Sequence, residues 1–189
     1  MIRIALVGDI GSGKSYFSKL FGYPVFNADS VVAQIYKKNK TCYNQIKKIF
    51  PNNFSTFPLK KEELIKCILS NQNNLKKITR IVHPLVSQQM KFFIKKNKNK
   101  KFVILDIPLF LENNLNLKND LIIFIQSTKS KINKSLIKRK NYNKRLIHAF
   151  KKIQWSLPMK KKKSDFIIKN TFEHRKALRD VQDLMKKII

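Results

Sequence analysis

The stretch IRIALVGDIGSGKS, residues 2–15, decides the fold of this chain. Its first half is a nearly continuous apolar run, and residues 8–15 have the spacing G-x-x-x-x-G-K-[ST] of a Walker A loop. The apolar run predicts a strand buried in a parallel sheet, and the pattern from Lys14 to Leu20 predicts a helix that Gly22 ends. A strand, a glycine-rich turn and a helix in this order predict a binding site for a phosphate group.

Each residue type in this loop suits phosphate binding. Glycines let the backbone approach a phosphate closely and adopt positive φ, so that several N–H groups converge on its oxygens. Lys14 is expected to reach the β- and γ-phosphates of a nucleotide, and the Ser15 hydroxyl to bind Mg²⁺. The residues expected to hold the phosphates are Gly8, Gly11, Ser12, Gly13, Lys14 and Ser15.

Four later segments also predict strands, because they are short and mostly apolar. They are residues 23–29, of which Asp29 is the last, residues 102–105, which Asp106 follows directly, residues 121–125 and residues 164–170. The segments between them predict helices: most of residues 30–96, with Pro84 at a helix start, residues 129–155, and a tail with one apolar face. Strands that alternate with helices predict an α/β fold with a parallel five-stranded core sheet flanked by helices.

Composition sets limits on the class of protein. The 189 residues include 41 Lys and Arg against 11 Asp and Glu, a formal net charge of +30. This charge could serve nucleic acid or an anionic membrane surface. Lysine and asparagine are nevertheless scattered over every segment, which favours a general compositional bias over a dedicated patch.

Cysteines and apolar runs exclude other classes. Cys42 and Cys67 form no CxxC pair, which argues against a disulfide framework and against a structural zinc site. No apolar run approaches the roughly 20 residues that span a bilayer, and no signal peptide precedes the first strand. We therefore expect no membrane partner and a cytoplasmic location.

Two carboxylates are expected at the sheet edge that carries the loop. Asp106 ends an apolar run in the manner of a Walker B strand, which suggests that it holds a Mg²⁺-bound water. Asp29 follows the second strand, where it could accept a proton from an attacking hydroxyl. The alternatives are a loop acid for Asp106 and a helix N-cap for Asp29.

Two basic side chains complete the candidate site. Arg139 lies in a late helical stretch, and arginine suits a lid over a transferring phosphate because its fork spreads charge over several oxygens. Spacing alone does not distinguish it from Lys138 or Arg145 as a solvated cation. His83 could contact a ligand or cap the helix expected at Pro84.

With these pieces in place the chain resembles the dephospho-CoA kinase family over nearly its whole length. The resemblance rests on IALVGDIGSGKS, VFNADSVVAQIY, IVHPLV and LDIPLFLENNL, in this order, followed by Arg139, Gln154 and SDFIIKN. The HPLV and DIPLFLE blocks in register with the Walker A loop make the match specific. The resemblance implies a P-loop kinase that phosphorylates the ribose 3′-hydroxyl of dephospho-CoA with ATP and Mg²⁺.

The resemblance also implies an organisation and residue roles. Residues 1–189 would form a single domain with a helical CoA-binding region at about 40–96 and a lid at about 130–163. Gly11 to Tyr16 would hold ATP, Asp29 would be the base, and Arg139 would belong to the lid. The residues that would line or brace the acceptor site are Asp29, His83, Pro108, Leu109 and Glu112.

Four residues depart from the family pattern. Asn27 stands where the family has a first aspartate, Tyr16 replaces a threonine, Asp9 replaces a glycine, and Phe150 stands where the lid has a second arginine. The change at Asn27 affects any role that needs two acids there, and the change at Phe150 could slow phosphoryl transfer.

Two alternative functions remain open at this stage. One is another small-molecule kinase on the same scaffold, which acts on a nucleoside or nucleotide. The other is a basic nucleic-acid-binding protein that uses ATP as a switch, although the chain has no recognisable nucleic-acid-binding motif. The sequence leaves open whether the protein is a monomer or a homo-oligomer.

Overall fold

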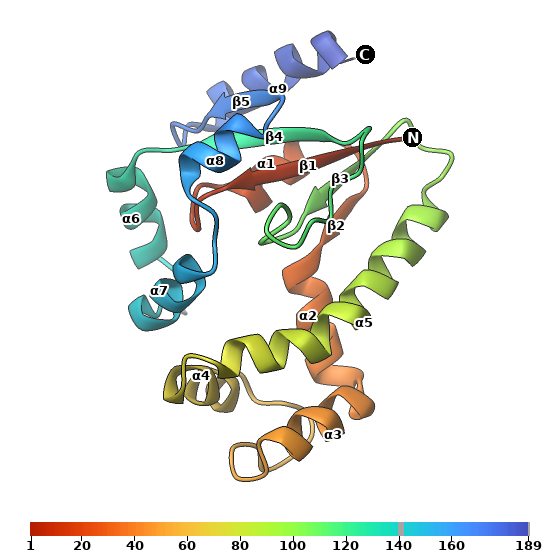
Figure 1. Cartoon of the computed structure of the whole chain (residues 1–189). Coiled ribbons are helices and arrows are strands. Elements are labelled where there is room, and N and C mark those ends of the chain that lie inside the picture. Colours follow the sequence, from red (N-terminus) through yellow and green to blue (C-terminus); the bar gives the residue numbers. More distant parts are fainter. Residues whose placement is uncertain (140–141, 189) are drawn as a thin grey trace. The chain divides into compact units, whose positions relative to one another are not determined.

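A parallel β-sheet forms the centre of one part of the fold. The computed structural model describes residues 1–139 and 142–188. Within them the strand order is β2-β3-β1-β4-β5, and all neighbouring strands are parallel (Figure 1). The strands are β1 (Ile2–Gly8), β2 (Val25–Asn27), β3 (Phe102–Asp106), β4 (Leu121–Gln126) and β5 (Phe166–Lys169). The parallel five-stranded sheet that the apolar runs predict is therefore confirmed.

Helices connect the strands, as the sequence predicts for parallel pairs. They are α1 (Lys14–Leu20), α2 (Ala28–Lys38), α3 (Lys40–Ile49), α4 (Lys61–Ser70), α5 (Asn74–Lys96), α6 (Lys129–Ile137), α7 (Lys144–Lys152), α8 (Leu157–Lys162) and α9 (His174–Ile188). No helix in residues 1–139 or 142–188 is long and apolar enough to cross a membrane.

Contacts divide the chain into two compact units. The core unit comprises residues 1–27, 97–142 and 153–189, and the helical unit comprises residues 28–96 and 143–152. The core unit therefore holds the sheet with α1, α6, α8 and α9, and the helical unit holds α2 to α5 and α7.

Apolar side chains of the sheet, α1 and α9 form the interior of the core unit. Ile4 and Ile104 on adjacent strands are fully buried, and Phe17 from α1 and Val181 from α9 pack in the same cluster. The tail helix predicted from its apolar face is thus confirmed, because that face covers the sheet.

The helical unit has an apolar interior of its own, which includes Ile46, Phe54 and Ile78. Cys42 and Cys67 lie within it as free thiols. Burial raises the pKa of Cys42 to about 11 and also raises the pKa of Cys67, since a thiolate is poorly solvated there. Both thiols stay protonated near neutral pH.

The expected helix start at Pro84 is wrong. Pro84 lies inside α5, which begins ten residues earlier at Asn74. Proline removes one backbone hydrogen bond from a helix interior, but Ile78 and Val82 remain buried and hold this part of α5 in the helical unit. The axis of α5 changes direction partway along its length, as a proline in a helix interior causes (Figure 1).

Two other expected boundaries are also wrong. The second strand ends at Asn27, so Asp29 lies in the first turn of α2 rather than at a strand end. The helical stretch expected from Lys129 to Trp155 is interrupted after α6. The side chain of Asn143 accepts a hydrogen bond from the N–H of Leu146 at 2.9 Å, which caps the start of α7.

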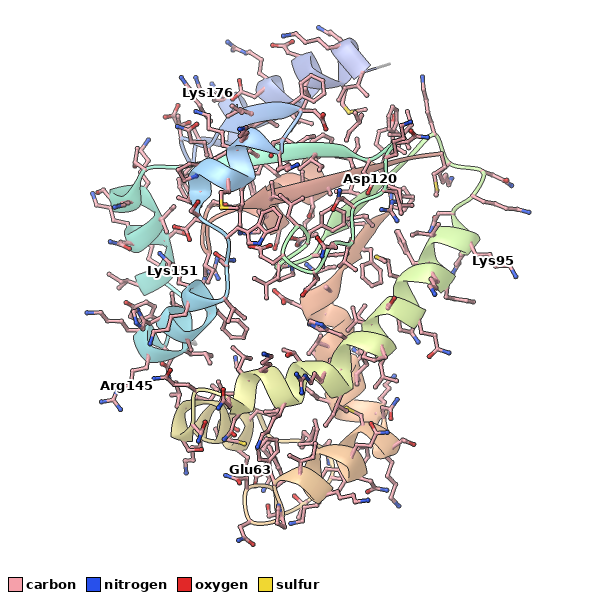
Figure 2. All side chains as sticks on the ribbon, in the orientation of Figure 1. Glu63, Lys95, Asp120, Arg145, Lys151 and Lys176 are labelled. Atoms are coloured by element: carbon pink, nitrogen blue, oxygen red, sulfur yellow. The ribbon has the colours of Figure 1, made fainter. Side chains whose placement is uncertain are left out.

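A buried ion pair fixes the outer end of β1. The Arg3 guanidinium donates to both oxygens of Asp120 and, at 3.0 Å, to the carbonyl of Leu115. Figure 2 marks Asp120, which precedes β4 and also accepts a hydrogen bond from the N–H of Leu117 at 2.8 Å. The pair thus ties β1 to the loop that enters β4.

We expect Arg3→Met to lower the free energy of unfolding by about 3–5 kcal/mol, because Asp120 would remain buried without its charge partner. Urea unfolding followed by circular dichroism measures the change. Lys186→Met is the matched control, since Lys186 pairs with Asp183 at 3.6 Å on the exposed surface and should matter by less than about 1 kcal/mol. Equal losses in both variants would contradict the role of burial.

Candidate active site

The loop between β1 and α1 has a backbone that glycine alone suits. Gly8, Gly11 and Gly13 have φ of 147°, 85° and 98°. A Cβ on Gly8 would lie 2.6 Å from the carbonyl oxygen of Ile125, and a Cβ on Gly13 would lie 2.4 Å from the amide nitrogen of Asn170. Strand β4 and the residue after β5 therefore lie close to the loop, and a side chain at Gly8 or Gly13 would displace the backbone.

Hydrogen bonds inside the loop hold this conformation. Lys14 Nζ donates to the carbonyls of Asp9 at 2.8 Å and Gly8 at 3.3 Å, and the N–H of Ser12 donates to Asp9 O at 3.1 Å. The carboxylate of Asp9, which departs from the family pattern, accepts the N–H of Ile10 at 2.7 Å. Lys14 thus places its positive charge against the loop that the sequence predicts to bind phosphate.

Asn170 links the loop to the end of β5, a role that its position in the sequence does not predict. Its Nδ2 donates to Ser12 O at 2.8 Å, while its Oδ1 accepts the N–H of Phe172 at 2.7 Å. Ser127 adds a second link, because its hydroxyl donates to Asn170 O at 3.1 Å and to Ser12 O at 3.4 Å. An asparagine that directly follows the last strand was the available signal.

The loop has features that fit a phosphate group. Ser12 Oγ is buried and has no hydrogen-bond partner among the described residues. Gly13 precedes α1, whose first N–H groups are directed out of the helix, where an anion binds well. Ser15 is exposed in the first turn of α1, so its hydroxyl is accessible. The hydroxyl of Tyr16, in contrast, lies 2.5 Å from His174 Nδ1.

Asp106 ends β3 beside β1. Its neighbour Leu105 pairs with Ala5, and β1 continues from there to Gly8. Asp106 is nearly buried, and Asn27 Nδ2 donates to its Oδ2 at 2.6 Å. An aspartate at position 27 would place two carboxylates in contact, whereas the amide of Asn27 supplies a neutral hydrogen-bond donor to Asp106.

A metal site at this edge would need few protein ligands. The described part of the chain contains no group of three or more His, Cys, Asp and Glu side chains suited to a metal. Mg²⁺ commonly binds one or two protein oxygens together with substrate phosphates and waters. The accessible hydroxyl of Ser15 and the carboxylate of Asp106 fit that mode.

The segment after β3 lines a pocket with the phosphate loop. Leu109, which has a positive φ of 60°, and Glu112 face this pocket together with Gly8 and Lys14. Glu112 Oε1 lies 2.8 Å from Lys160 Nζ, and the pair is buried. Pro108 lies between Asp106 and Leu109 in the same segment and is partly exposed.

Helix α6 packs on the loop and leads to Arg139. A Cβ on Gly11 would lie 2.8 Å from Leu136 Cγ, so α6 lies directly against the loop. Arg139 is exposed and follows Leu136 by three residues, and its N–H donates to Leu136 O at 3.0 Å. Arg139 therefore lies in the core unit, just after the helix that packs on the loop.

Three predicted residues belong to the helical unit. Asp29 lies in the first turn of α2, and Phe150 is partly buried in α7. His83 lies within α5, and partial desolvation of its ring lowers its pKa, although the residue is still partly accessible to solvent. The structure thus groups the loop, Asp106, Leu109 and Glu112 in one unit, and Asp29 and His83 in the other.

Known proteins match this chain along its length. The family described as dephospho-CoA kinase matches residues 2–175. The dephospho-CoA kinase of Wolbachia pipientis wMel is 34% identical over 187 residues, which cover 96% of this chain and 95% of that protein. The enzyme of the same name from Zymomonas mobilis is 30% identical and covers 90% of this chain and 88% of that protein.

Solved structures share the fold. The structure of TT1252 from Thermus thermophilus has a TM-score of 0.79 at 22% identity and covers 100% of this chain and 97% of that one. Dephospho-CoA kinase from Campylobacter jejuni has a TM-score of 0.65 at 21% identity and covers 98% and 96% of the two chains. The family match over residues 2–175 and the relative that is 34% identical over 96% of this chain show that the chain belongs to the dephospho-CoA kinase family.

Proposed function

We propose that this chain transfers the γ-phosphoryl group of ATP to the ribose 3′-hydroxyl of dephospho-CoA, which is the last step of coenzyme A synthesis. The observation that supports it most is the position of the loop of residues 8–15 in the core unit, where Gly8 and Lys14 lie around a small cavity with the segment after β3. The loop would supply the phosphate ligands, and the segment after β3 carries the residues that resemble the acceptor-binding block of the family.

The loop residues would bind the triphosphate. Backbone N–H groups around Gly11 and Gly13 would surround the phosphate oxygens, and Lys14 Nζ, which donates to the carbonyl of Asp9 in this structure, would instead reach the β- and γ-phosphates. Ser15 and Asp106 would hold Mg²⁺, which neutralises charge on the phosphate oxygens when it is bound. The γ-phosphoryl group would then face the pocket beside Leu109 and Glu112.

Asp29 would accept the proton of the acceptor hydroxyl or orient that hydroxyl for attack. Asp29 lies in the first turn of α2, where an aspartate is a common residue. Arg139 would contact the transferring group from the end of α6, and His83 would contact the acceptor. Exclusion of water by the lid would matter, because water competes with the acceptor for the phosphoryl group.

An acceptor panel tests the proposed reaction. We expect dephospho-CoA to stimulate ADP release strongly, and adenosine, a nucleoside monophosphate and shikimate to leave it near background. Phosphorus NMR of the product should place the new phosphate at the 3′ position. Lys14→Ala should abolish turnover, while Lys19→Ala, on the exposed last turn of α1, should retain it. Strong stimulation by another acceptor would overturn the assignment of the substrate.

A methyl group on Gly13 tests the role of the loop in ATP binding. Gly13→Ala should weaken ATP binding about tenfold or more, because the Cβ would strain the backbone and meet Asn170. Gly22→Ala is the matched control: it has φ of 71°, but no atom lies within 4 Å of the added Cβ. Calorimetric titration with ATP and Mg²⁺ measures both affinities. Wild-type affinity in Gly13→Ala would show that the loop does not hold the nucleotide.

Substitution of Asp29 separates catalysis from binding. Asp29→Asn should lower kcat by about 10²–10⁴-fold, since it removes the proton acceptor, and should leave the affinity for ATP nearly unchanged. Asparagine is also favoured near helix starts, so α2 should persist. Asp183→Asn, which removes an exposed carboxylate from α9, is the control for charge. A parallel loss of kcat and ATP affinity would remove Asp29 from the role of base.

A further inference from the structure

Lys160 is a buried lysine within a run of exposed ones. The run from Met159 to Ser164 contains four consecutive lysines, of which Lys161, Lys162 and Lys163 are exposed. The side chain of Lys160 is 3% exposed, and a buried ammonium group needs a charged partner. That partner is Glu112, whose side chain is 7% exposed and whose Oε1 lies 2.8 Å from Lys160 Nζ.

The same carboxylate oxygen holds a second group. The backbone N–H of Trp155 donates to Glu112 Oε1 at 2.9 Å. Trp155 lies between the end of α7 at Lys152 and the N-cap of α8 at Ser156. Glu112 therefore fixes the segment by which the chain enters α8, and Lys160, one turn into α8, balances its charge.

Both charged side chains also border the phosphate loop. Lys160 and Glu112 line the same small pocket as Gly8 and Lys14, and Gln154, which precedes Trp155, also lines it. Helix α8 packs against β1, the strand that leads into the loop. A shift of the ion pair would therefore move the wall of the pocket and the segment around Trp155 together.

We propose that Lys160 is a positioning residue for phosphoryl transfer. It pairs with the Glu112 carboxylate, which accepts the N–H of Trp155, and so holds residues 153–156 against the segment that follows β3. The effect on turnover rests on the proposed function, because it assumes that the pocket beside Glu112 receives the reacting groups. The effect on Trp155 does not depend on the substrate.

Three variants and one control test this role. Lys160→Met removes the charge at nearly constant volume, and Glu112→Gln keeps an oxygen that can accept the Trp155 N–H. The double variant carries both changes and leaves no buried charge without a partner. Lys161→Met, an exposed lysine on the same helix, is the matched control. The readouts are kcat, the two KM values, the thermal midpoint and the emission of Trp155, which is the single tryptophan of the chain.

We expect Lys160→Met to lower kcat by about 10- to 100-fold, with a smaller change in KM for ATP, because the pocket wall is displaced. Its Trp155 emission maximum should shift, while Lys161→Met matches the wild type in every readout. Addition of Glu112→Gln should return the emission and part of kcat toward wild type, since no lone buried carboxylate remains. If Lys160→Met alone does not fold, the double variant is expected to fold.

Three results would overturn the proposal. They are wild-type kcat and emission in Lys160→Met, a loss of kcat in that variant with unchanged emission, and a double variant that is worse than Lys160→Met. The second result would mean that Lys160 contacts the substrate directly. Failure of the wild-type protein to phosphorylate dephospho-CoA would contradict the proposed function. The Trp155 emission and the thermal midpoint of the variants would still test the role of Lys160.

Discussion

The fold of the core unit depends on how closely the strands approach the loop at the end of β1. The carbonyl oxygen of Ile125 and the amide nitrogen of Asn170 lie 2.6 Å and 2.4 Å from where Cβ atoms of Gly8 and Gly13 would be, so the loop is confined by backbone and by a hydrogen-bonded side chain. Because neighbouring residues hold the glycine-rich loop in one conformation, its backbone N–H groups can point in the same direction. Phosphate recognition here is a property of the sheet as much as of the eight-residue motif.

Most of the sheet could be predicted from the sequence, because buried parallel strands are nearly continuous apolar runs. Residues 102–106 and 121–126 are such runs, and the pattern of the tail placed Val181 and Leu184 on the buried face. Helix boundaries that depend on single residues are harder to predict from the sequence. Pro84 predicts a helix start because proline restricts the residue before it, which is a local effect. The burial of Ile78 and Val82, which precede Pro84 in α5, depends instead on tertiary packing.

Some residues of the candidate site can be predicted from local sequence spacing, and others only from tertiary contacts. The Walker A residues have a fixed spacing, so the sequence alone could place them together in one loop. Asn170 and Lys160 could not be found by spacing, because their roles come from contacts across 158 and 48 residues with Ser12 and Glu112. Asn27 illustrates the opposite case: the sequence identified it as a departure from the family, and the structure supplies the reason, since its amide donates to the carboxylate of Asp106.

The burial of two acidic side chains in ion pairs leaves the surface of the protein strongly positive. Asp120 and Glu112 each neutralise one buried cation, so they do little to offset the lysines and arginines outside, such as Lys95, Arg145 and Lys176, which extend from the ribbon in Figure 2. Surface cations repel one another and attract anionic metabolites over a screening distance of roughly 10 Å at 0.1 M ionic strength. Added salt therefore acts on this protein in two opposing ways: it relieves the repulsion that loosens the compact state, and it weakens the long-range pull on phosphorylated substrates.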